Sequence, residues 1–217
     1  MHRTLMSLPQ WPALRLALPR VMLVALLLAP PAALAGAQKY EPLSASVHGA
    51  LSRSVSDRAP QHSSFEDSTV ATDWLAEMSG RLAKRIPDRV ARMEFLRSVH
   101  YEATRAGLDP QLVLGLIQVE SGFKKYAVSS AGARGFMQVM PFWVKLVGRS
   151  EDNLFHLRTN LRYGCTILRH YLDIERGDLY RALGRYNGSL GQATYPNLVR
   201  AAWHNQWKYT PGALALR

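Results

Sequence analysis

The glutamate at position 120 follows a run of apolar residues at helical spacing. Val113, Leu116 and Ile117 stand seven, four and three positions before Glu120, so its carboxyl group shares their face of a helix. Burial and the negative end of the helix dipole are both expected to raise the pKa of this group. A carboxylic acid that is neutral near pH 7 can act as a general acid. The alternative is that the side chain reaches solvent or pairs with one of the lysines that follow it.

The helix that would carry Glu120 has start and stop signals in the sequence. Asp109 is a good N-cap and Pro110 a good first helical residue, so a helix is expected over residues 110–121. Gly122 closes it, and the small residues of the segment 129–135 (SSAGARG) allow backbone to approach closely. The sequence therefore predicts a short helix that delivers a carboxyl group to a tight loop.

Apolar residues at helical spacing predict further helices around this one, and no run alternates like a strand. The expected helices are one capped by Asp73, one over residues 87–106 with Val90 on its buried face, one over 141–147, one over 158–176, one from Asp178 to about 187, and one after Pro196. The fold class is therefore predicted to be mostly α, with a single domain over residues 71–217.

The chain begins with a pattern typical of a signal peptide. Three arginines precede nine apolar residues at 21–29, and Ala33-Leu34-Ala35 is a suitable cleavage site, with Ala37 as a second. The apolar run is too short to cross a bilayer, which disfavours the alternative of a retained membrane anchor. We predict a signal peptide over residues 1–35, a flexible linker over the Ser-rich residues 36–70, and a soluble exported protein without a stable anchor.

Charge and cysteine content exclude several classes of partner. Removing residues 1–35 takes away three arginines and no acid, which lowers the formal charge from +11 to +8. This basic balance suits an anionic partner, but Lys and Arg are scattered and no nucleic-acid motif is present, so nucleic acid is not expected. Cys165 is the only cysteine and should pack as a small apolar side chain. The histidines lack metal-ligand spacing, and no metal or cofactor is expected.

Three motifs in order resemble the soluble (Slt-type) lytic transglycosylases, whose catalytic domain is lysozyme-like. Glu120-Ser121 matches the family's Glu-Ser pair, and the segment 135–141 (GFMQVMP) is similar to its Gly-Leu-Met-Gln-x-x-Pro signature, with Phe136 where leucine is usual. The segment 185–188 (RYNG) looks like its Ala-Tyr-Asn-Ala-Gly motif, although Arg185 and Gly188 depart from the common form. The resemblance covers residues 89–203 approximately.

The resemblance implies roles for six residues. Glu120 would be the catalytic acid and base, and the other five would bind substrate: Ser129, Gln138, Met140, Tyr186 and Asn187. Simpler roles stay open for most of these. Met140 could fill the core, Gln138 could satisfy backbone groups of its loop, Tyr186 lies on a buried helix face, and Asn187 before a glycine could be a helix C-cap.

The resemblance further implies the reaction. The family cleaves peptidoglycan between N-acetylmuramic acid and N-acetylglucosamine without water and leaves 1,6-anhydromuramoyl ends. Two alternatives remain at this stage: a goose-type muramidase, which needs a second carboxylate, and a non-catalytic wall-binding scaffold. The expected partner is the glycan strand in the periplasm, and the sequence leaves open whether a secretion or conjugation machine of the cell envelope is another.

Overall fold

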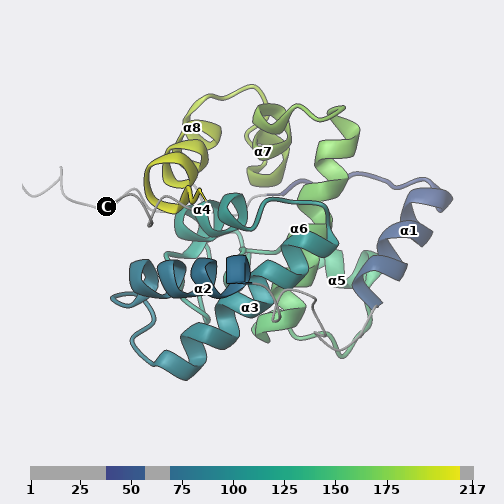
Figure 1. The fold of residues 1–217 in the computed structure, drawn as a ribbon. Helices are drawn as coiled ribbons and strands as arrows, with labels where there is room; N and C mark the ends of the chain where they lie inside the picture. Colours follow the sequence, from purple (N-terminus) through teal and green to yellow (C-terminus); the bar gives the residue numbers. More distant parts are fainter. Residues whose placement is uncertain (1–37, 57–68, 211–217) are drawn as a thin grey trace, which may run out of the picture. The chain divides into compact units, whose positions relative to one another are not determined.

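The computed structural model describes residues 38–56 and 69–210, which all fall in one compact unit. Figure 1 shows that this part of the chain is built from helices. The helices are α1 (Ala45–Ser56), α2 (Thr69–Leu82), α3 (Arg89–Arg105), α4 (Pro110–Ser121), α5 (Phe142–Val147), α6 (Leu157–Ile174), α7 (Leu179–Asn187), α8 (Thr194–Ala202) and a π-helical turn, Trp203–Trp207. Between the described helices the only sheet-like pairings are two isolated bridges, Val128 with Arg134 and Arg134 with Val139. The prediction of a mostly α fold is confirmed.

Helix α4 is central to the packing of the domain. Val113, Leu114, Leu116 and Ile117 are fully buried, and α4 packs against α3, α8 and the π-helical turn. The helix begins as the sequence predicts: the Asp109 side chain accepts a hydrogen bond from the amide of the second helical residue, with proline at the first position. It ends at a glycine in the left-handed conformation, with φ 58°.

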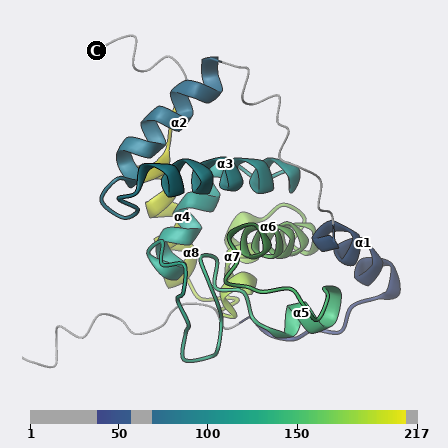
Figure 2. The same cartoon turned by 90° about the horizontal axis from the view of Figure 1, so that it is seen from below.

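Helix α6 forms the second main support of the core. It packs against α1, α3 and α7, and Figure 2 shows α3 lying across α4 and α6. A fully buried carboxylate on α3, Glu102, pairs with Arg162 of α6 at 2.8 Å and with Arg105 at 3.0 Å. Because a buried charge is costly without a partner, this cluster fixes how the two helices meet.

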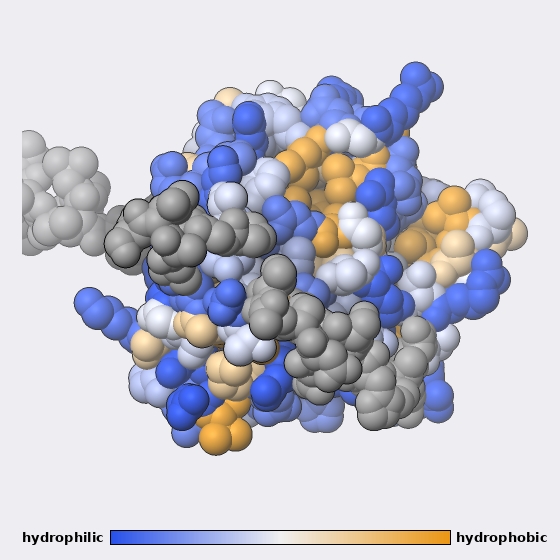
Figure 3. Space-filling view, viewed as in Figure 1, coloured by the Kyte–Doolittle hydropathy of each residue, from blue (hydrophilic) through white to orange (hydrophobic). Residues whose placement is uncertain are grey.

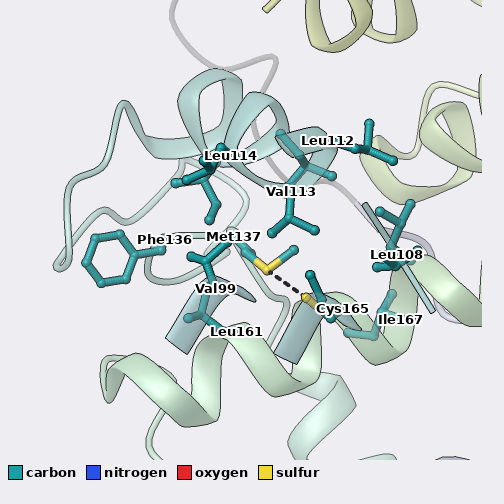
Figure 4. Packing of buried hydrophobic residues seen from close by; sticks show 14 of the residues in the cluster. Val99, Leu108, Leu112, Val113, Leu114, Phe136, Met137, Leu161, Cys165 and Ile167 are labelled. Carbon is teal, nitrogen blue, oxygen red and sulfur yellow. Dashed lines mark hydrogen bonds between the residues drawn. The ribbon is translucent and has the colours of Figure 1, made fainter. Parts of the chain in front are cut away.

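The loop between α4 and α5 packs its Met137 side chain against α6. Met137 points toward Cys165, with 4.0 Å between the two sulfur atoms (Figure 4). Cys165 is fully buried among apolar side chains, as predicted, and burial raises the pKa of its thiol. Hydrophilic residues cover most of the face shown in Figure 3, with apolar residues gathered in smaller patches.

The expectation of a flexible linker over residues 36–70 is wrong for residues 38–56. Helix α1 lies in this range and packs against α5 and α6. Val47, Leu51 and Val55 recur every fourth residue, and this apolar stripe is buried against the core although the surrounding composition is Ser-rich. The residues between α1 and α2, like the predicted signal peptide, lie outside the described residues.

Two local expectations also differ from the structure. Helix α2 begins at Thr69, so Asp73 lies inside it rather than capping it. Val90 is 78% exposed, because at helical spacing it lies on the opposite side of α3 from the buried Val99. Within residues 38–56 and 69–210, no helix is both long and apolar enough to span a bilayer.

Candidate active site

Glu120 lies in the last turn of α4 and is 5% exposed. The prediction that it faces inward is confirmed, and the alternative in which it reaches solvent is wrong. The Tyr195 hydroxyl, on α8, donates a hydrogen bond to its Oε1. Helix α4 packs against α8 and the π-helical turn after it, and the approach is close at Gly115, where a Cβ atom would lie 2.8 Å from the backbone nitrogen of Trp203, the first residue of that turn. The packing of the two helices thus sets the position of the carboxyl group.

Two buried tyrosines lie in the field of this carboxyl group. Burial, and after it the charge of Glu120, raises the pKa of both Tyr186 and Tyr195 well above the usual 10. Their hydroxyl groups therefore stay protonated at physiological pH and act as donors. Tyr186 donates to the Met137 carbonyl at 2.7 Å, which joins α7 to the loop that carries the second motif.

Gln138 adopts a left-handed backbone conformation, with φ 47°, which is costly for a residue with a side chain. The side-chain nitrogen of Gln138, Nε2, donates to the carbonyls of Ala127 at 3.1 Å and Gly135 at 2.9 Å, and these bonds hold the conformation. Both N–H groups of the Gln138 amide are thus used inside the loop. The structure thus shows the simpler role that the sequence left open for Gln138, which is to satisfy backbone groups of its own loop.

Of the other three predicted binding residues, two lie in the loop between α4 and α5 and one ends α7. Ser129 is half-buried, and its hydroxyl accepts from the Ala133 amide at 3.1 Å, closing the turn of small residues. Met140 packs partly against the core. Asn187 is the last residue of α7; its Nδ2 donates to the Ser189 hydroxyl at 3.0 Å, while its buried Oδ1 accepts no hydrogen bond from the described residues.

Comparison with known proteins identifies the family. A family model described as "Transglycosylase SLT domain" matches residues 97–203. These residues belong to the SLT transglycosylase family. Glu120 and all five predicted binding residues lie within the SLT domain, and the helix α1 and the segment before it lie outside it.

Relatives of the SLT domain carry matching names. The transglycosylase of Enterobacteria phage PRD1 is 33% identical over 103 residues, which are 48% of this chain and 38% of the phage protein. The membrane-bound lytic murein transglycosylase C of Mannheimia succiniciproducens is 38% identical over 88 residues, which are 36% of this chain and 25% of that protein. The chain therefore spans less than half the length of these relatives.

Asn160 of α6 is a site residue that sequence reasoning missed. It is fully buried, and its side chain donates to the carbonyls of Arg134 at 2.8 Å and Leu154 at 2.9 Å. Its Oδ1 accepts from the Met137 amide at 2.8 Å. The available signal was a polar residue on a helix face that otherwise buries apolar side chains. Asn160 thus clamps the loop on which Gln138 and Met140 stand.

Tyr195 and Gln38 were missed as well. Tyr195 reaches Glu120 from 75 positions along the chain. Gln38, at the start of the described residues, is 4% exposed and hydrogen-bonds to the backbone of the loop around Gln138.

Among the described residues no group of three or more His, Cys, Asp or Glu side chains could hold a metal ion.

Proposed function

We propose that the protein is a lytic transglycosylase that cleaves the bond between N-acetylmuramic acid and N-acetylglucosamine in peptidoglycan. One observation carries the proposal: a carboxyl group, Glu120, is buried at a helix end, bonded to a tyrosine, and lies within the residues that match the SLT domain. The name of the Mannheimia relative, a lytic murein transglycosylase, supports murein as the substrate.

In the proposed reaction Glu120 does both proton transfers. It gives its proton to the glycosidic oxygen, and the leaving sugar departs from C1 of the muramoyl residue. The Glu120 carboxylate then takes the proton of the muramoyl C6 hydroxyl as that oxygen bonds to C1, which produces a 1,6-anhydromuramoyl end and restores the acid. The nucleophile belongs to the substrate itself, so no water is consumed and little entropy is lost in positioning it.

Tyr195 supports this cycle because its hydroxyl donates to Oε1 of Glu120. A hydrogen bond to a carboxylate stabilises the charged form, which exists between the two transfers. Ser129, Met140 and Asn187 would contact the glycan, and the buried Oδ1 of Asn187 is an acceptor suited to a sugar hydroxyl or amide. Gln138 and Tyr186 are buried and bonded within the protein, so they would act on the glycan through the loop that they hold.

The muramidase alternative needs a second carboxylate near the bond that breaks. Asp109 caps the opposite end of α4, roughly 16 Å from Glu120 by the helical rise. Asp152 accepts from the Tyr163 hydroxyl at 2.6 Å and Asp178 caps α7. Asp173 pairs with Arg169 on the surface of α6. The engagement of these four acids elsewhere favours the transglycosylase.

The proposed site of action is the periplasm, where peptidoglycan lies, and it agrees with the predicted signal peptide. A secretion or conjugation machine of the cell envelope stays a candidate partner.

Digestion of purified sacculi tests the function. The chain without residues 1–35 should release muropeptides that are lighter by one water than reducing-end products, detected by mass spectrometry. Glu120→Gln should abolish them, while Glu94→Gln, on the exposed face of α3, should not. In H₂¹⁸O a muramidase would incorporate the label, and this result would replace the proposed reaction. A scaffold would release nothing and would bind sacculi equally well with either variant.

A further inference from the structure

The Gln38 side chain makes two hydrogen bonds to the backbone of the loop between α4 and α5. Its Nε2 donates to the Gln138 carbonyl at 3.1 Å, and its Oε1 accepts from the Met140 amide at 3.1 Å. Gln38 is 4% exposed, so both bonds are shielded from water. The loop therefore presents one carbonyl and one N–H group that together fit a single amide.

An amide with this pattern is also present on both sugars of peptidoglycan. The acetamido group of N-acetylglucosamine and of N-acetylmuramic acid offers an N–H donor and a carbonyl acceptor, the two kinds of group with which the carboxamide of Gln38 bonds to the loop. The carbonyl of Gln138 and the amide of Met140 belong to two residues that the family resemblance assigns to substrate binding. Gln38 thus presents the substrate's own functional group to them.

The residues after Gln38 continue from this loop toward α7 and α5. Glu41 pairs with Arg185 at 2.9 Å, and the Tyr40 ring contacts Phe142 edge-on at 5.9 Å between centroids. Arg185 directly precedes Tyr186 and departs from the family motif, and it pairs with Glu175 as well as with Glu41. Figure 1 shows the segment running from the start of α1 toward α7.

We propose that residues 38–44, hereafter the N-terminal segment, occupy part of the proposed glycan-binding site and compete with substrate, with Gln38 in the place of a sugar acetamido group. The proposal rests on the proposed function, because it takes the ligand of this site to be an N-acetylated glycan. The segment is a tethered competitor whose effective concentration is high, so it raises the substrate concentration required for turnover.

The anchoring of the N-terminal segment is suited to release. Apart from Gln38 its side chains are mostly exposed: Tyr40 is 61% exposed, and the Glu41 side chain in the ion pair is 50% exposed. Exposed ion pairs contribute little stability. Leu43 packs partly against the core and Val47 follows four residues later, so the part of the segment before Leu43 can leave its place while α1 stays packed.

Kinetics on peptidoglycan fragments test the competition. Gln38→Ala should lower KM about threefold to tenfold at unchanged kcat, because one or two hydrogen bonds of the competitor are lost. Gln38→Glu should also lower KM, because it places a carboxylate next to the Gln138 carbonyl. This variant tests the competition if Gln38→Ala fails to fold. Lys39→Ala, in the same segment with an exposed side chain, is the matched control. An unchanged or higher KM in both Gln38 variants would mean that the segment is part of the binding surface.

Amide hydrogen exchange with tetra-N-acetylchitotetraose separates this inference from the proposed function. The sugar should speed exchange at residues 39–44 while the Met140 amide stays protected, since the ligand replaces Gln38 as its partner. Slower exchange at residues 39–44 with sugar would overturn the inference. If sacculi are cut in a Glu120-dependent way without this displacement, the inference fails and the function stands. If the displacement occurs and no sacculus is cut, the proposed function fails and the inference stands.

Discussion

The Tyr195 hydroxyl donates a hydrogen bond to Oε1 of Glu120, and this contact joins the C-terminal end of α4 to α8. Both side chains are buried, so the bond is made in surroundings that strengthen electrostatic interactions. Each residue is held by its own helix, so the bond depends on how α4 and α8 pack together. The relationship makes Tyr195 a positioning residue that acts through Glu120.

Tyr195→Phe is expected to lower kcat on peptidoglycan about 10- to 100-fold with little change in KM. The lost bond to a charged group is worth about 1.5–3 kcal/mol, and it acts on the charged intermediate state of Glu120. Steady-state kinetics measure the effect, with Tyr180→Phe on α7 as the control. Because the pKa of Tyr195 is raised well above 10, the wild-type enzyme should keep this donor up to at least pH 10. Equal kcat values for Tyr195→Phe and the wild type would remove Tyr195 from the mechanism.

Gly115→Ala should destabilise the domain by about 1–3 kcal/mol. The added methyl group would meet the backbone of Trp203 at 2.8 and 3.0 Å, and backbone atoms cannot move aside as a flexible side chain can. Separation of α4 from α8 would also pull Glu120 from Tyr195, so activity should fall further than stability explains. Urea unfolding and kinetics on the same preparation measure both effects.

Gly80→Ala is the matched control for this change. Gly80 lies inside α2, and nothing stands within 4 Å of its added methyl group. Alanine should therefore stabilise the domain by about 0.5–1 kcal/mol through helix propensity alone. If both substitutions shifted the free energy of unfolding in the same direction, the close approach of α4 and Trp203 would not be a constraint.

The sequence predicted those features of the fold that depend on interactions between residues close together in the chain. The cap at Asp109, the glycine after α4 and the face on which Glu120 lies follow from short-range hydrogen bonds and helical spacing, and the structure confirms them. Residues 38–56 were misjudged because their three apolar positions are spaced for a helix but diluted by serine.

The contacts that complete the site could not be predicted, because they join residues far apart in the chain. Tyr195 is 75 positions from Glu120, Asn160 is 23 from Met137, and Gln38 is 100 from Gln138. Each pairing depends on how the helices pack, and a hydroxyl or amide in the sequence carries no sign of its distant partner. The family motifs located the loop but not the side chains that hold it.

Asn160→Ala should cost about 2 kcal/mol or more in the free energy of unfolding. It leaves the Leu154 carbonyl and the Met137 amide, both in buried hydrogen bonds, without their present partner, and each unsatisfied group costs about 1 kcal/mol or more. The Arg134 carbonyl loses one bond but keeps the one that it accepts from the Val139 amide at 3.0 Å. Asn197→Ala, exposed on α8, should change stability by less than about 0.5 kcal/mol. Urea unfolding compares the two, and a loss below about 1 kcal/mol at position 160 would show that the loop holds its conformation without the clamp.

Acid should weaken the folded state through His100 of α3. Burial lowers the pKa of His100 to about 4, and its ring contacts Trp74 of α2 edge-on at 5.3 Å. The unfolded chain binds a proton near pH 6.5 that the folded chain does not, so this contribution to stability is complete above pH 6.5 and is lost as pH falls toward 4. Because the ring is only partly buried, we expect a loss of about 1–2 kcal/mol across this window. His100→Gln should flatten the difference in thermal stability between pH 7 and pH 4.5, and His156→Gln, at an exposed position, should leave it as in the wild type. An identical pH profile for His100→Gln and the wild type would mean that His100 titrates alike in both states and that the acid sensitivity of the α2–α3 packing has another source.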